Sequence, residues 1–160
     1  MTAALLGAAL AGCGDDSMRS GDSDQPTITE PQALEQAERY VRDLVTALPA
    51  SARLEEQGKL SSRCPDESGT GFDKRVRANA NYWVRDLDPA QYNAYFDAVK
   101  TWLESHGWVV RNDDRPADMF LNAYREQDDF IMSLQANNKG GLVLGAASPC
   151  VWPGGTPESQ

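Results

Sequence analysis

The apolar residues of the chain follow two different periods, and the first is helical. Between residues 34 and 48 apolar side chains recur every three or four positions, and charged side chains fill most of the positions between them. This spacing places the apolar side chains on one face of an amphipathic helix. The segment from Thr29 to Gln32 has the form of a capping box, with a proline in the first turn. We expect the helix to begin after Thr29 and to end before Pro49.

From residue 74 the period changes to two, which is the pattern of a strand. Apolar residues occupy the even positions from 76 to 84, and polar or charged residues, together with one tryptophan, occupy the odd positions from 75 to 85. This alternation predicts a strand with one face in the core. Residues 50–72 contain proline and glycine without a clear period, and we expect at most one short strand there, at 58–63.

A second helix and four short strands complete the pattern. Asp88 and Pro89 repeat the start signal of a helix, an apolar face runs from residue 92 to 106, and Gly107 supplies the left-handed residue that ends it. Short polar turns, which favour antiparallel pairing, separate extended segments at 108–112, 119–124, 130–136 and 142–147. The sequence therefore predicts an α+β domain, with two helices packed on one face of a mainly antiparallel sheet of four to six strands. The pattern leaves open whether the strands flanking the second helix pair in parallel or lie apart.

Length and charge exclude several classes of protein. The chain has 160 residues, 41% of them hydrophobic and 24% charged, which suits one domain with its own core. Its 24 acidic and 15 basic residues give a net charge of −9, so we expect no nucleic-acid partner, because phosphates would be repelled. No apolar run reaches the roughly 18–20 residues that a membrane-spanning helix needs.

The first twelve residues have the character of a secretory signal peptide. They are small and apolar, and Leu10-Ala11-Gly12-Cys13 resembles the lipobox of bacterial lipoproteins. The resemblance implies a diacylglyceryl group on the Cys13 thiol, further acylation of the palmitate type, and cleavage that leaves Cys13 as the mature N-terminus. Two acyl chains suffice for stable anchoring. The alternative is the start of a buried helix with an ordinary core cysteine.

The expected signal peptide, 1–12, lacks the basic start of such signals, because no lysine or arginine precedes Arg19. We therefore expect it to be truncated at its N-terminus. Residues 13–30 are rich in glycine, serine and aspartate and are predicted to form a flexible acidic tether behind the lipidated cysteine. The single α+β domain is expected over 31–150 and a disordered tail over 151–160.

Once Cys13 carries lipid, Cys64 and Cys150 remain as an even pair in an oxidising location. We favour a structural disulfide between them, which adds one disulfide to the predicted fold and stabilises it by roughly 4–5 kcal/mol as an upper figure. Two free buried thiols, or a reactive thiol beside a base, are the alternatives. No CxxC spacing is present for zinc or thiol exchange.

Residues that could carry catalysis are few. His106 is the only histidine, and the end of a helix is where an imidazolium stabilises exposed carbonyls. The aspartate pairs at 113–114 and 128–129 lack the spacing of a calcium loop, and Ser68-Gly69-Thr70-Gly71 lacks the lysine of a phosphate loop. We therefore expect no catalytic residue, metal or cofactor that the sequence can identify.

The outward face of the strand at 74–85 is the most suggestive surface. It presents Arg75, Arg77, Asn79, Asn81, Trp83 and Arg85. Of these, Arg75, Arg77, Trp83 and Arg85 form a cationic strip with an aromatic ring in an otherwise acidic protein. Such a strip is a candidate site for an anionic ligand or partner. The alternative is a solvated sheet face on which arginine side chains half-cover Trp83.

The lipobox and the acidic tether are followed by helices and strands in the order given above. The segment Cys64-Pro65-Asp66 and the final strand before Cys150 complete the pattern. Together these features make the chain similar to membrane lipoproteins of actinobacteria. The LppA-like lipoproteins of mycobacteria are the group it most resembles. The resemblance implies a lipid-anchored protein on the extracytoplasmic face of the cell membrane, but no active site. We expect a non-catalytic binding or accessory module of the cell envelope, whose partner is an envelope protein or an anionic cell-wall ligand. The alternatives are a hydrolase of cell-wall or exported substrates with unidentified carboxylates, and a carrier of an apolar ligand between sheet and helices.

Overall fold

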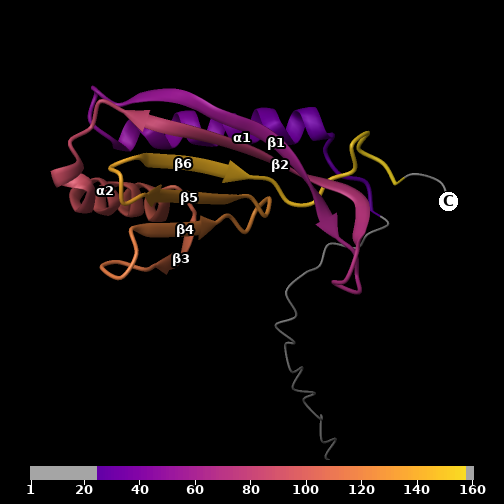
Figure 1. Ribbon diagram of the computed structural model, residues 1–160. Coiled ribbons are helices and arrows are strands. Elements are labelled where there is room, and N and C mark those ends of the chain that lie inside the picture. The colour runs from indigo at the N-terminus through magenta and orange to yellow at the C-terminus, as the bar shows by residue number, and fades with distance from the viewer. Residues whose placement is uncertain (1–24, 158–160) are drawn as a thin grey trace, which may run out of the picture.

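The computed structural model describes residues 25–157, so the signal peptide, Cys13 and most of the expected tether lie outside the described residues. Two α-helices, two short 3-10 helices and six strands make up the described chain (Figure 1). The helical elements are α1 (Glu30–Leu44), η1 (Val45–Ala47), η2 (Pro89–Gln91) and α2 (Tyr92–Ser105). The strands are β1 (Arg53–Pro65), β2 (Phe72–Arg85), β3 (Val109–Asp113), β4 (Phe120–Tyr124), β5 (Ile131–Ala136) and β6 (Leu142–Ala147).

The six strands form one sheet in the order β1-β2-β6-β5-β4-β3, and every neighbouring pair is antiparallel. The predicted α+β class is confirmed. The strands that flank α2 do not pair, because β2 lies next to the β1 edge and β3 forms the opposite edge. The chain crosses the whole sheet in passing from β2 through α2 to β3.

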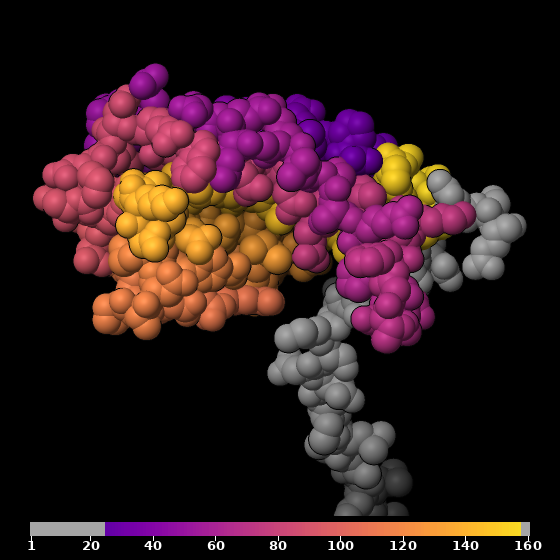
Figure 2. All heavy atoms as spheres, in the orientation of Figure 1, coloured from indigo at the N-terminus to yellow at the C-terminus, as the bar shows by residue number. Residues whose placement is uncertain are grey.

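Both helices lie on one face of the sheet, and the core lies between them and the strands. α1 packs on β2 and β6, and α2 packs on β3 and β4. The even positions of β2 and the matching positions of β4, β5 and β6 point into this core, where Leu121, Leu134 and Leu144 are fully buried beneath Phe96 of α2 and Leu44 of α1. The other face carries no helix, and we call it the open face. Figure 2 looks onto this face, where the orange and gold strands are at the surface.

The start signals read from the sequence act as expected at α1. The Thr29 side chain accepts a hydrogen bond from the backbone of Gln32, whose side chain accepts one from the backbone of Thr29. At the second helix Asp88 caps the 3-10 turn η2 instead, and α2 begins one turn later, at Tyr92. Gly107 ends α2 with a φ of 78°, the left-handed conformation that glycine adopts without strain.

The prediction of a short strand at 58–63 is wrong in its extent. β1 runs over 13 residues and pairs with almost the full length of β2. An irregularity between Glu56 and Gly58 shifts the phase of the alternation. Most of its side chains are exposed on both faces, so no hydrophobic period marks the strand.

The predicted disulfide between Cys64 and Cys150 is confirmed, with the two Cα atoms 6.1 Å apart. Cys64 lies inside β1, one residue before its end. The bond joins the outer end of the β1–β2 hairpin to the segment that follows β6 (Figure 1).

The expected boundaries of the domain are wrong at both ends. The tail predicted to be disordered from residue 151 packs instead: Val151 is fully buried and bridges Val76, and Trp152 is 8% exposed. The backbone of Thr27 donates to Gly155, so the end of the expected tether belongs to the domain as well. Residues 27–30 and 152–155, which are far apart in the sequence, are joined by hydrogen bonds here. Neither segment has a hydrophobic period that would predict its packing.

Candidate ligand-binding surfaces

The structure does not gather the arginines of the predicted strip into one site. Arg75 and Arg85 lie ten residues apart on β2, which at the usual rise along a strand is about 30 Å. The Arg75 guanidinium pairs with Asp73 at 2.7 Å, and Arg85 pairs with Glu55 through two bonds of 3.0 Å. Their charges are therefore largely neutralised within the hairpin.

Two members of the strip do come together. The Arg85 guanidinium carbon lies 4.9 Å from the centre of the Trp83 ring, a cation–π contact at one end of β2. Arg77 lies farther along the strand, and its buried Nε has no hydrogen-bond partner among the described residues. The predicted binding of an anionic ligand to Arg75, Arg77, Trp83 and Arg85 stays a prediction. The strip is divided into two parts, with Arg85 and Trp83 at one end of β2 and Arg75 and Arg77 farther along the strand.

The register of the sheet lines up a row of residues across five strands, of which the sequence analysis had placed only Asn81 on the suggestive face. Asn81 of β2 pairs with Gly145 of β6, Gly145 pairs with Ser133 of β5, and Ser133 pairs with Asn122 of β4. Asn122 in turn pairs with Asn112 of β3. Because residues directly opposite each other share a face, all five lie on the open face. We call them the amide row.

The polar side chains of the amide row are not used to hold the fold. Within residues 25–157, the side chains of Asn81, Ser133 and Asn122 make no hydrogen bond to another residue, although each is only half-exposed. Asn79, one pair of positions along β2, is different, because its amide donates to the backbone carbonyls of Leu60 and Arg77. The amide row therefore has free donors and acceptors for a ligand, whereas Asn79 has a structural role.

Aromatic residues flank the amide row on both sides. The neighbouring ladder on one side places Trp83 of β2 and Phe120 of β4 at its two ends. The ladder on the other side contains Tyr124, against which the Arg111 guanidinium packs with its carbon 3.9 Å from the ring centre. All three rings are partly exposed, so each offers part of its ring to a molecule lying across the sheet.

A separate cleft of about 360 Å³ lies on the helix side of the molecule. Tyr40 and Trp108, in edge-to-face contact at 5.0 Å, are buried and contribute to its lining. The other lining residues come from the end of α1, from η1, from the end of α2 and from the turn after β4: Asp43, Thr46, Trp102, His106 and Arg125. Its volume is at the small end of the range for ligand sites.

The buried phenol of this cleft is held as a hydrogen-bond donor. The Tyr40 hydroxyl donates to Asp128 and accepts a bond of 2.6 Å from Arg125. Burial first, and then the Asp128 carboxylate, raises the pKa of Tyr40 to about 12. The phenol is thus neutral at physiological pH and does not act as a base. It ties α1 to the turn between β4 and β5.

His106 has the helix-terminal position that the sequence predicts. Its Nδ1 lies 2.7 Å from the carbonyl oxygen of Trp102, and its ring stacks on the Trp102 ring with centroids 3.9 Å apart. Trp108 is buried, whereas Trp102 is only partly buried and lines the cleft. No serine or cysteine nucleophile is among the residues that line the cleft.

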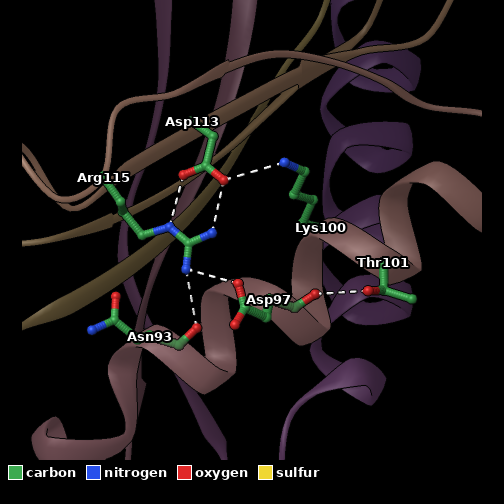
Figure 3. A network of polar contacts seen from close by, with 6 residues as sticks. All are labelled: Asn93, Asp97, Lys100, Thr101, Asp113 and Arg115. Carbon is green, nitrogen blue, oxygen red and sulfur yellow. Dashed lines mark hydrogen bonds and ion pairs between the residues drawn. The ribbon is translucent and has the colours of Figure 1, made fainter.

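The acidic pairs take part in structural contacts. Asp113 accepts two bonds of 2.7 Å from Arg115 and one of 3.4 Å from Lys100, and Arg115 also reaches Asp97 at 3.0 Å (Figure 3). These partners hold the pKa of the Asp113 carboxyl at about 2, with the Arg115 hydrogen bonds as the largest cause. The cluster ties β3 and the turn after it to α2. Over the described part of the chain, no group of three or more histidine, cysteine or acidic side chains is arranged to hold a metal ion.

No protein-family model matches the chain, and neither the curated proteins nor the solved structures searched gave a match. No helix of the described chain is long and apolar enough to cross a membrane.

Proposed function

We propose that the protein is an exported lipoprotein, held on the outer face of the cytoplasmic membrane by acylated Cys13, and that its folded domain is a non-catalytic binding module of the cell envelope. The lipobox at residues 10–13 supports the location, as does the disulfide, because such bonds persist in oxidising compartments. The similarity to LppA-like lipoproteins of mycobacteria belongs to the same proposal.

The single observation that carries the binding role is the open face. A sheet face that lacks a helix cover and carries polar side chains with no internal partner is suited to receive a ligand. In each aspartate pair that the sequence singled out, one carboxylate has a structural partner. Asp113 is held by Arg115 and Lys100, and Asp128 accepts a hydrogen bond from Tyr40. The unpaired side chains of the amide row itself are amides and a hydroxyl, which can bind a ligand and have no acid–base chemistry near neutral pH.

The hydrolase alternative has less support. Glycoside hydrolysis in most families requires two carboxylates about 5–9.5 Å apart. Asp43 is the only carboxylate among the residues that line the cleft on the helix side. The apolar carrier has no specific observation in its favour, because large side chains such as Phe96 and Phe130 fill the space between sheet and helices.

Lipid attachment is tested by metabolic labelling with an alkyne fatty acid, with the gene at its native locus so that any upstream codons are kept. We expect the protein to be labelled and to sediment with membranes, and Cys13→Ser to abolish both. Cys64→Ser is the matched control, because it removes a thiol and leaves the lipobox intact. Labelling that persists in Cys13→Ser, or is missing from the native protein, contradicts the proposal.

A further inference from the structure

We propose that the amide row is the binding site for an uncharged saccharide chain, which lies across the strands of the open face. This inference rests on the proposed function and names the ligand class of the same face. Its basis is the alignment that the register creates. Asn81, Ser133 and Asn122, whose side chains have no hydrogen-bond partner within residues 25–157, lie in one row across the sheet, with Gly145 between the first two.

The chemistry of the amide row selects a ligand with many hydroxyl groups. Each carboxamide offers two donors and an acceptor, and each hydroxyl offers both, so Asn81, Ser133 and Asn122 match groups that donate and accept at once. Sugar hydroxyls have this dual character, whereas phosphates and carboxylates only accept. None of the five residues of the row is charged, and the net charge of −9 opposes an anionic ligand.

The length of the row favours a chain over a single ring. Asn81 and Asn112 are four strands apart in the sheet, which at the usual strand spacing is about 19 Å. Donors and acceptors at these intervals are too far apart for one sugar to contact them all. An extended oligosaccharide that crosses β2, β6, β5, β4 and β3 would meet each in turn.

Gly145 lets two polar side chains come together at the centre of the row. A Cβ atom added there would collide with the Asn81 Oδ1 and lie 3.4 Å from the Ser133 Oγ. Gly145 itself is buried, because the Asn81 side chain lies over it and takes the space that a larger residue would fill. A ligand at the middle strand therefore meets the Asn81 amide and the Ser133 hydroxyl rather than the backbone of β6.

The flanking rings complete the match. Trp83 and Phe120 lie on the ladder at one side of the row and Tyr124 on the ladder at the other. The apolar faces of sugar rings, which carry C–H groups, pack well against aromatic side chains, and the ring hydroxyls remain free for the amides. An extended polypeptide would instead satisfy its backbone at an edge strand and would not need this row.

The test uses the lipidated full chain in detergent and an array of neutral linear oligosaccharides beside uronic-acid and phosphate-bearing ones. We expect binding to neutral oligomers and little binding to single sugars. The double variant Asn81→Ala/Asn122→Ala should lower the affinity at least about tenfold, because both changed side chains lose their contacts to the ligand. Asn93→Ala on α2 is the matched control: its side chain is exposed on the helix side and it should bind as the native protein does.

Circular dichroism and the midpoint of unfolding check that the double variant folds. Preference for the acidic oligomers, or equal binding by the native protein and the folded double variant, would overturn the saccharide proposal. Loss of all binding by a protein that still carries lipid overturns this inference alone. A protein that binds oligosaccharides but takes no lipid overturns the anchor and leaves the site standing.

Discussion

The body of the domain and the outer hairpin are stabilised by different means. We define the outer hairpin as residues 60–78, the part of β1 and β2 that extends past the ladder with β6, and the body as the rest of the described chain. In the body, β2 has a partner strand on each side, and both helices cover the sheet. In the outer hairpin the further backbone partners of β2, within the described residues, are Ser148, which donates to the Ala78 carbonyl, and Val151, which bridges Val76. Figures 1 and 2 show the hairpin bending away beyond the body.

Burial follows the same division. Phe96 in the body is fully buried, whereas Phe72 and Leu60 in the outer hairpin are 67% and 68% exposed. Among the described residues, the small hydrophobic cluster at the hairpin has three buried members, Ala33, Ala78 and Val151, with the partly buried Leu34 and Val76 packed against them. The disulfide lies in this region, where apolar burial is least. A covalent link therefore restrains the part of the molecule that has almost no core of its own.

The largest expected effect comes from removing a core side chain of the body. Phe96→Ala should lower the free energy of unfolding by about 3–5 kcal/mol, because it leaves a cavity beneath α2. Phe72→Ala is the matched control in the outer hairpin and should change it by less than about 0.5 kcal/mol. Urea unfolding followed by tryptophan fluorescence measures both. Similar losses for the two variants would show that the regions do not differ as described.

A smaller and more local effect is expected from removing the disulfide. Cys64→Ser with Cys150→Ser should lower the free energy of unfolding by about 2–4 kcal/mol, because the unfolded chain regains the freedom of a loop whose ends are 86 residues apart. Amide hydrogen exchange should speed up first in the outer hairpin and at Val151, while the amides of β4 to β6 stay protected. Uniform loss of protection would contradict the local role.

The smallest effect concerns an ion cluster of the body. The pKa of Asp113 is about 2 in the folded protein, below its ordinary value of 3.8, so its contribution to stability is present at pH values well above 3.8. That contribution is lost as the pH falls from about 4 towards 2, because the unfolded state takes up the proton first. Asp113→Asn should lower the free energy of unfolding by about 1–2 kcal/mol at pH 7. It should also flatten the pH dependence of stability between pH 4 and 2; an unchanged slope would contradict this assignment.

Local signals predicted the body well and the outer hairpin poorly. The helices at 30–44 and 92–105 and the strand at 72–85 bury one face each, and that burial leaves a period in the sequence. β1 was predicted only in part, at 58–63, because most of its side chains are exposed on both faces and nothing selects apolar residues at alternate positions. The packed segment at 151–157 was missed for a related reason: its burial depends on residues 27–29 and 76, far away along the chain.

The candidate site could be predicted from local sequence signals even less completely than the fold. Trp83 and the arginines of β2 could be named from one strand, but their ion pairs with Asp73 and Glu55 depend in part on how β1 pairs with β2. The amide row draws one residue from each of five strands. An asparagine or serine at an outward position is ordinary in any strand, so no sequence signal distinguishes these five residues from others.

From the sequence alone we could predict both helices, most strands and a mainly antiparallel α+β class, and could favour a disulfide between Cys64 and Cys150 over free thiols. Each of these follows from spacing within a segment or from the count of cysteines. Only the tertiary structure decided the strand order, the length of β1, the packing of residues 151–157 and the register that aligns Asn81, Ser133 and Asn122. The physical reason is that a period of two says which face a residue occupies but not which residue lies beside it, and that choice is made by packing across the whole sheet.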